Sequence, residues 1–247
     1  MIGGALVGWW GAPAAFVVAT ALSLFAVSLL LRLPSARPAA AAQRRHPLNE
    51  LREGMGFVAG HNLLRPLLIV AVVFNFSWFI LQAVYAPYAV RHLGLGASGL
   101  GATLGAYGAG MIVGALGAPA LQRFLSFGAM IVVGPLTAFV AALRMAATIA
   151  VPSPWLAGVS FFLFGVGPIV WVITTTTLRQ TVTPNAMLGR VSAIIVTATF
   201  GARPAGAAIS ATFGVDACLA LSAIGFGVQL AVILASAPPR LKALPAE

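Results

Sequence analysis

The sequence predicts an all-α polytopic membrane protein, with seven transmembrane helices that follow a shorter apolar stub at the start of the chain. Of its 247 residues, 60% are hydrophobic and only 7% are charged, whereas about a quarter of a soluble domain is charged. Long segments without a charged residue include residues 1–31, 66–90, 145–178 and 217–239. A helix needs about 20 apolar residues to cross a bilayer, so each of these segments is long enough for a span.

The first element expected is a helix over residues 13–31, which ends at Arg32 and Pro34. Residues 1–11 are apolar and rich in glycine, but they are too short to span a bilayer. They lack the basic start of a signal peptide and continue into a spanning pattern, so no signal peptide is expected. Residues 35–47 are rich in Ala, Pro and Arg, which indicates a flexible linker.

Asn49 to Gly60 is expected to form a short amphipathic helix. At helical spacing its apolar residues share one face, and they are Leu48, Leu51, Met55 and Val58. The charged residues Glu50, Arg52 and Glu53 lie away from that face. A helix of this kind can lie on the surface of a membrane.

Six further spans complete the chain and make seven in all. They are expected near residues 66–90, 99–121, 128–151, 154–177, 190–212 and 215–236. The basic residues lie mostly in the loops on one side of these spans, and basic loops face the cytoplasm. Eleven are expected there: Arg32, Arg37, Arg44, Arg45, Arg52, Arg65, Arg123, Arg179, Arg190, Arg240 and Lys242. The loops of the other side hold only Arg91, so the C-terminus is expected in the cytoplasm.

The formal charge of +10 does not indicate a nucleic-acid partner, because the basic residues form no patch with stacking aromatics. Cys218 is the only cysteine, which excludes an intrachain disulfide and a thiolate metal cluster. The three histidines, His46, His61 and His92, lie in loops and are too scattered for a metal site. We therefore expect neither a cofactor nor a metal.

A family resemblance is carried by residues 161–191, which read FFLFGVGPIVWVITTTTLRQTVTPNAMLGRV. The pattern Gly165-x-Gly167, Trp171, Leu178-Arg179-Gln180 and Pro184-x-x-x-x-Gly189-Arg190-Val191 resembles the region between the tenth and eleventh helices of the major facilitator superfamily. It is most similar to the bacterial branch that includes the enterobactin exporter.

The resemblance implies that the chain runs from the end of the fifth family helix to the twelfth. Residues 1–33 would then be a partial helix and the last helix of the N-terminal half, and 34–64 a cytoplasmic linker with the amphipathic helix. Residues 65–237 would form the C-terminal six-helix half, and 238–247 a cytoplasmic tail. Because such transporters have two halves, we expect an N-terminally truncated chain or a misplaced start.

Candidate cavity residues follow from polar side chains within the spans. Asn75, Trp78, Gln82 and Tyr85 are spaced 3, 4 and 3 residues apart and share one face of a helix. Such a stripe should face protein or water rather than lipid. It would line the central cavity of the family fold, or pack against a neighbouring helix. Tyr107, on the next helix, is a further candidate, while Gly110 and Gly114 are expected to form a close helix-packing seam.

Arg203 is the strongest candidate for a functional residue. Insertion of an arginine in the middle of a span costs about 2.5–3.5 kcal/mol of free energy on insertion scales. It should face the interior and find a partner there. Apart from Asp216, at the outer end of the last span, the spans contain no acidic residue. The partner would be a carbonyl, an anionic substrate or an acid of the absent half. Arg144, nearer a helix end, is expected to extend to the interface instead.

A deformable gating helix is predicted from Gly165, Gly167 and Pro168, followed by Thr174 to Thr177, whose hydroxyls can bond to their own helix carbonyls. Trp171 would cap the cavity or fill it. The segment 178–190 is expected to form a cytoplasmic gating loop that carries Arg179, Gln180, Pro184, Gly189 and Arg190. The segment GAPALQR, which ends at Arg123, occupies the position of the family's second cytoplasmic motif. The acidic residue that is usual in that motif is missing from this chain.

The resulting hypothesis is transmembrane transport by alternating access, and the resemblance implies export of drug- or siderophore-like compounds across a bacterial inner membrane. The expected partners are a small-molecule substrate, the lipid bilayer and the missing N-terminal half. The alternative is a non-transporting or split membrane module that needs a separate N-terminal half. An enzyme is not expected, because no span carries a His/Asp/Glu/Cys constellation.

Overall fold

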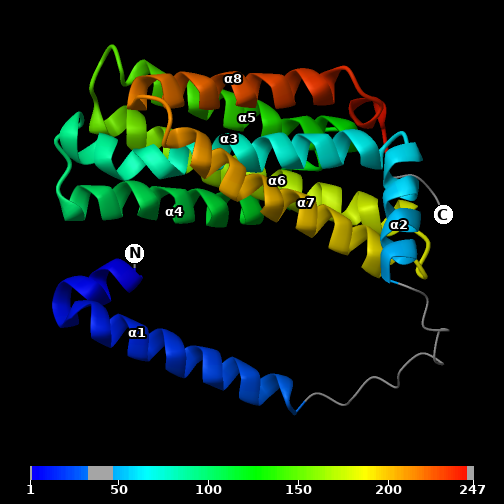
Figure 1. Ribbon diagram of the computed structural model, residues 1–247, viewed down its shortest axis with the longest axis horizontal. Coiled ribbons are helices and arrows are strands. Elements are labelled where there is room, and N and C mark those ends of the chain that lie inside the picture. The colour runs from blue at the N-terminus through cyan, green and yellow to red at the C-terminus, as the bar shows by residue number, and fades with distance from the viewer. Residues whose placement is uncertain (1, 33–46, 244–247) are drawn as a thin grey trace. The chain divides into compact units, whose positions relative to one another are not determined.

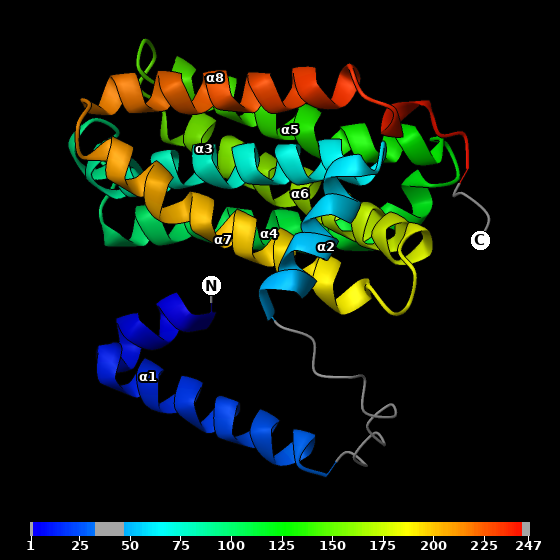
Figure 2. The ribbon, with the colours of Figure 1, turned by 45° about the vertical axis from the view of Figure 1, so that its right-hand side comes forward.

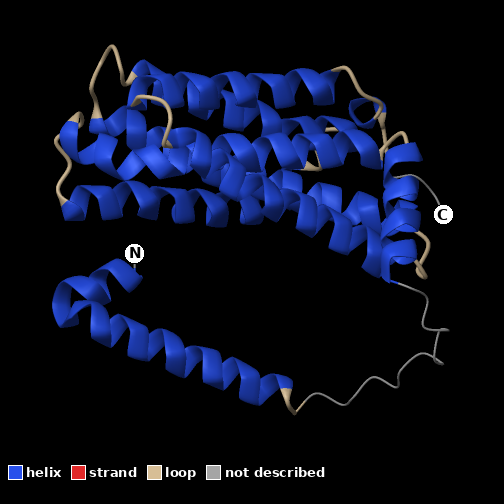
Figure 3. Ribbon diagram, in the orientation of Figure 1, coloured by secondary structure: helices blue, strands red, loops and turns tan. Residues whose placement is uncertain are grey.

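The computed structural model describes residues 2–32 and 47–243, and within these ranges the secondary structure is helical (Figure 3). The chain divides into two compact units, Met1–Pro47 and Leu48–Glu247. The predicted linker over residues 35–47 lies almost wholly outside the described residues, as do Arg37, Arg44 and Arg45.

The first unit contains one helix, α1 (Ile2–Leu30). The predicted stub and the predicted first span are joined in this helix, which contains Pro13. Proline lacks an N–H donor and bends a helix, and Figure 1 shows a bend in the N-terminal part of α1. Among the described residues, six helices are long and apolar enough to cross a membrane, and Phe16–Leu30 of α1 adds a shorter apolar segment.

The second unit contains these six helices, preceded by the short helix α2 (Pro47–Gly60). They are α3 (Leu64–Arg91), α4 (Ala97–Leu121), α5 (Phe127–Ala147), α6 (Pro154–Val182), α7 (Leu188–Ser210) and α8 (Val215–Leu234). A short 3₁₀ turn, η1 (Pro238–Arg240), follows. The six spans expected for this half are therefore confirmed as helices, and the largest shift of a boundary is at the end of α6.

The six long helices of the second unit pack on one another in a repeated pattern. α3 packs on α7 and α8, α6 packs on α4 and α5, and α5 also packs on α8. The set of packed helix pairs stays the same when α3, α4 and α5 are exchanged with α6, α7 and α8 in that order. Each half of a major facilitator fold is built from two such three-helix repeats of inverted topology. Figures 1 and 2 show the six helices side by side, with α2 across one end.

Glycine lets α4 and α6 approach closely. A side chain at Gly110 would strike the carbonyl oxygen of Phe162, and one at Gly165 would strike the carbonyl oxygen of Tyr107. Gly114 has a similarly close neighbour in the carbonyl of Val166. The predicted packing seam of Gly110 and Gly114 is thereby confirmed, with backbone meeting backbone.

The largest buried cluster is aromatic and lies between α3, α6 and α8. The Trp78 ring centroid lies 4.8 Å from that of Phe164, and the Phe164 centroid lies 5.1 Å from that of Phe226. Phe161 lies 4.3 Å from Tyr85 between centroids. Edge and tilted arrangements of this kind stabilise aromatic clusters beyond their area burial.

The apolar face predicted for α2 is exposed in one part and packed against the six-helix group in another. Leu51 and Met55 are 50% and 43% exposed, whereas Gly54 and Val58 are buried. Gly54 lies against the side chain of Ile194 on α7, and Val58 packs with Leu64 and Val191. The absence of a side chain at Gly54 lets α2 press this edge against α7, which turns Leu51 and Met55 outward.

Candidate functional site

A cavity of about 210 Å³ lies within the second unit, and all six apolar helices contribute to its wall. Its lining consists of Val70, Ala71, Phe74, Asn75, Tyr107, Met111, Gly134, Pro135, Gly165, Pro168, Ile169, Trp171, Val172, Arg203 and Gln229. Most of the wall is apolar, with a few polar side chains that converge from five different helices. That combination is typical of a small-molecule site.

Arg203 reaches the cavity from α7 and is held there by an amide and two aromatic rings. Its Nε donates to Asn75 Oδ1 at 3.1 Å. The guanidinium carbon lies 3.8 Å from the ring centroid of Phe200 and 5.2 Å from that of Phe79. A cation over an aromatic face is attracted by the ring quadrupole. The partner seen is therefore a side-chain carbonyl on α3, together with two phenylalanines.

Asn75 is fixed at both ends of its amide. Its Nδ2 donates to the carbonyl oxygen of Ala71 at 2.9 Å, one turn earlier in α3, while its Oδ1 accepts from Arg203. This arrangement orients the amide, because only the oxygen can accept from the guanidinium. Asn75 therefore positions Arg203 in the wall of the cavity.

Gln229 is a cavity residue that the sequence analysis missed. It is fully buried on α8, and neither its Nε2 nor its Oε1 has a hydrogen-bond partner among the described residues. Trp171 also lines the cavity. Its indole Nε1 is likewise buried with no hydrogen-bond partner among the described residues. The available signal was an uncharged polar residue in the otherwise apolar span 217–239.

The predicted stripe on α3 divides between the cavity and the core. Asn75 lies in the cavity wall, whereas Trp78 and Tyr85 are buried outside it. The Tyr85 hydroxyl donates to Thr103 Oγ1 on α4 at 2.6 Å, and Gln82 is exposed. Tyr107 lies in the cavity wall, with its ring stacked 5.4 Å from Trp78 between centroids.

The loop predicted over residues 178–190 is shorter than expected, because both neighbouring helices extend into it. α6 continues to Val182 and α7 begins at Leu188, so Arg179 and Gln180 are helical. Gly189 and Arg190 belong to α7, and of the predicted loop residues only Pro184 lies in the connecting segment.

Several threonine hydroxyls of α6 bond to carbonyls of their own helix. The hydroxyls of Thr174, Thr175 and Thr177 donate to carbonyls four residues earlier, at 2.8, 2.7 and 3.1 Å. The predicted bonds of these three threonines to their own helix are confirmed. Thr181 repeats the pattern with the carbonyl of Thr177 at 3.1 Å. Bonds of this kind satisfy the hydroxyls within the helix and often bend it.

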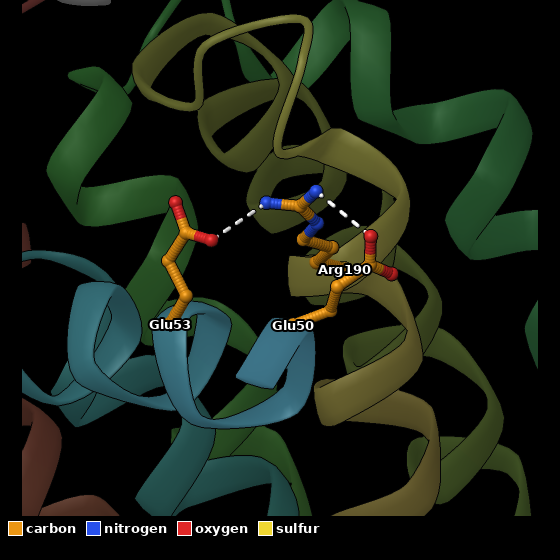
Figure 4. Close-up of polar contacts among 3 residues, drawn as sticks. All are labelled: Glu50, Glu53 and Arg190. Atoms are coloured by element: carbon orange, nitrogen blue, oxygen red, sulfur yellow. Dashed lines mark hydrogen bonds and ion pairs between the residues drawn. The ribbon is translucent and has the colours of Figure 1, made fainter. Parts of the chain in front are cut away.

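Arg190 joins α7 to α2. Its NH1 donates to Glu53 Oε2 at 2.9 Å and its NH2 donates to Glu50 Oε1 at 3.1 Å (Figure 4). The other two predicted gating arginines differ from it. Arg123 is exposed in the turn between α4 and α5, and Arg179 carries a buried Nε that has no partner among the described residues.

Six apolar helices arranged as two packed triplets, with a partly polar cavity that all of them share, define a multi-pass membrane transporter. The family model described as transmembrane secretion effector matches residues 1–246, and the chain belongs to this family of the major facilitator superfamily. The superfamily resemblance of residues 161–191 is thereby confirmed. Major facilitators are transporters rather than a class of enzymes. Comparison with curated proteins and with solved structures gives no match.

Proposed function

We propose that the protein exports small organic molecules across a bacterial plasma membrane by alternating access. The observation that carries this proposal is the cavity of about 210 Å³, to which all six apolar helices of the second unit contribute. Major facilitators bind substrate near the middle of the bilayer and expose it to either side by rocking one helical half against the other. Membership in the secretion-effector family supports the outward direction.

The proposed cytoplasmic side is the end of the six-helix group that carries α2. The ends of α4 and α6 and the starts of α3, α5 and α7 share this end with the C-terminal segment (Figure 1). Arg65, Arg123, Arg179 and Arg190 lie at these helix ends. Retention of basic loops in the cytoplasm supports this orientation. The α6–α7 connection, with Arg190 held by α2, is proposed to form part of the cytoplasmic gate.

A second helical half is proposed to complete the site. The cavity is smaller than the roughly 300–1,000 Å³ that is usual for small-molecule pockets, which favours a site whose remaining wall comes from other helices. The alternative function, a split module that transports only with a separately encoded half, rests on the same observation. A drug- or siderophore-like substrate remains part of the proposal through the motif around Arg179 and Arg190.

Uptake into everted membrane vesicles tests the transport function. Vesicles from cells that express the chain, and matched vesicles from cells without it, would be given anionic fluorescein, cationic ethidium and neutral Nile red. Export by the intact cell becomes uptake by the everted vesicle, so at least one dye should accumulate only where the chain is present. Equal accumulation of all three dyes in both preparations, with the protein present in the membrane, would contradict transport by this chain.

Two neighbouring tryptophan substitutions give a matched control. Met111 lies in the cavity wall, whereas Ile112 is 63% exposed. Met111→Trp should fill the cavity and abolish dye uptake, while Ile112→Trp should leave it unchanged. If neither chain nor variant transports alone, co-expression with a six-helix N-terminal half that restores uptake would support the split-module alternative.

A further inference from the structure

The polar groups in the cavity wall are dominated by hydrogen-bond donors. Arg203 offers N–H donors and no acceptor, and its bond to Asn75 engages only Nε. For its two terminal amino groups, no hydrogen bond is present among the described residues. The Asn75 oxygen is already engaged by Arg203, and its Nδ2 by Ala71. The guanidinium end therefore remains available to an incoming acceptor.

The positive charge of Arg203 also lacks a carboxylate partner nearby. Across the described helices α3 to α8 the acidic residue is Asp216, in the first turn of α8. Arg203 is half-buried, and taking a cation out of water is costly unless it is paired. An amide and the faces of Phe200 and Phe79 are what surround it here. The cavity wall is therefore cationic, and an anion would satisfy it.

A second set of unsatisfied groups lies in the same wall. Trp171 Nε1 is a donor only, and it is buried with no partner in the described part of the chain. Gln229, fully buried, likewise has both amide atoms unpartnered among those residues. Because a buried polar group without a partner is rare and costly, these groups point to a ligand that supplies the missing hydrogen bonds.

We infer that the cavity recognises an anionic, acceptor-rich organic compound with an apolar or aromatic body. The anionic group pairs with Arg203, and a second acceptor takes hydrogen bonds from Trp171 and Gln229. Phe74, Met111 and Ile169 in the same wall provide apolar contact for the body. This inference names the substrate class and rests on the proposed transport function, since the cavity is the same one.

Three probes of one shape and different charge test the inference: 2-naphthoate, 2-naphthamide and 2-naphthylmethylammonium. Binding to the full chain would be measured by equilibrium dialysis in phosphatidylcholine nanodiscs, with protein-free nanodiscs subtracted for partition into lipid. Naphthoate should bind at least about tenfold more tightly than the ammonium probe, as expected for one charge-assisted hydrogen bond. Equal affinity, preference for the cation, or no saturable naphthoate binding would overturn the inference.

Arg203→Gln keeps a donor for Asn75 but removes the charge, so it should weaken naphthoate binding about tenfold and abolish the charge preference. Arg203→Lys keeps the positive charge, so it should retain the preference for naphthoate over the ammonium probe. Retained binding in this variant would show that the loss of naphthoate binding in Arg203→Gln does not come from misfolding. Arg144→Gln is the matched control, because Arg144 is exposed near the end of α5, and it should change nothing. Gln229→Leu should weaken naphthoate and naphthamide by a similar factor, since both carry an acceptor.

The binding and uptake results separate this inference from the proposed function. Vesicles that accumulate ethidium but not fluorescein would leave transport standing and overturn the anionic class. Naphthoate binding that depends on Arg203, in a chain that transports none of the dyes, would support the ligand class and count against transport by this chain alone.

Discussion

Glu53 of α2 and Arg190 of α7 lie 137 residues apart in the chain, and their side chains form an ion pair of 2.9 Å. Glu50 accepts from the other terminal nitrogen of the same guanidinium at 3.1 Å. Arg190 thus ties the start of a spanning helix to the helix that crosses the end of the six-helix group. Gly54 and Val58 of α2 add close packing at the same place.

A double-mutant cycle should detect this ion pair as a modest coupling. The side chains of Arg190 and Glu53 are 24% and 46% exposed, and exposed pairs are worth about 0.2–1 kcal/mol. Arg190→Ala combined with Glu53→Gln should therefore destabilise the protein less than the sum of the single changes, by that amount. Thermal unfolding in detergent at low salt measures it, and the coupling should shrink in high salt.

Arg52, an exposed arginine of the same helix, supplies the control for that cycle. Arg52→Ala combined with Glu53→Gln should give additive effects. Additive effects for the Arg190 pair as well would show that the ion pair contributes nothing measurable to the fold.

Close packing of α4 on α6 should make Gly110 intolerant of a methyl group. Gly110→Ala places a side chain against the carbonyl oxygen of Phe162, with further backbone behind it, so the helices must separate. Overpacking of this kind costs about 1–3 kcal/mol. Gly108→Ala, on the same helix but with no neighbouring atom within 4 Å, should be neutral or slightly stabilising because alanine favours helix. Unfolding temperatures of the two variants in detergent provide the comparison, and equal values would contradict the seam.

Tyr85→Phe should reduce stability but leave ligand binding intact. The change removes the hydroxyl that donates to Thr103, and an interhelical hydrogen bond of this type in a membrane protein is worth about 0.6 kcal/mol on average. Tyr85 lies outside the cavity lining, so naphthoate affinity should remain at the level of the unmodified protein. A loss of naphthoate binding with unchanged thermal stability would instead assign Tyr85 to the binding site.

Helical spacing located the side chains around each helix but not their depth along it. Asn75 and Tyr85 were predicted as parts of one stripe, yet ten residues of helix extend about 15 Å. Over that distance α3 passes from the cavity to the buried contact with Thr103. Gln82 belongs to the same stripe and is exposed, because which neighbour covers a face depends on tertiary packing.

Polarity within apolar segments was the more reliable guide to the cavity. Arg203 and Asn75 were both predicted as cavity candidates, and both lie in its wall. Their direct hydrogen bond joins residues 128 apart in sequence, and no local pattern contains that pairing. Gln229 carries the same kind of signal as Asn75, but its neighbours at helical spacing are Gly225, Phe226, Val232 and Ile233, so it belongs to no polar stripe.

Stability should fall as the pH drops, through His61, in the segment between α2 and α3. Its Nδ1 accepts from the backbone N–H groups of Leu63 and Leu64 at 3.2 and 3.4 Å, and so it caps the start of α3. Burial lowers the pKa of His61 below its ordinary value of 6.5. The unfolded chain therefore binds a proton more readily than the folded one, and this contribution to stability is complete above pH 6.5 and is lost progressively as the pH falls toward the folded-state pKa.

Unfolding temperatures between pH 7.5 and pH 5 test this dependence. His61→Asn keeps a side-chain acceptor that can cap a helix but does not titrate, so the decrease in stability over this range should become shallower. His92→Asn, at the opposite end of α3, should leave the decrease in place. The same slope in the His61 variant and the unmodified protein would assign the acid sensitivity to another group, and the capping contact would then have no role in it.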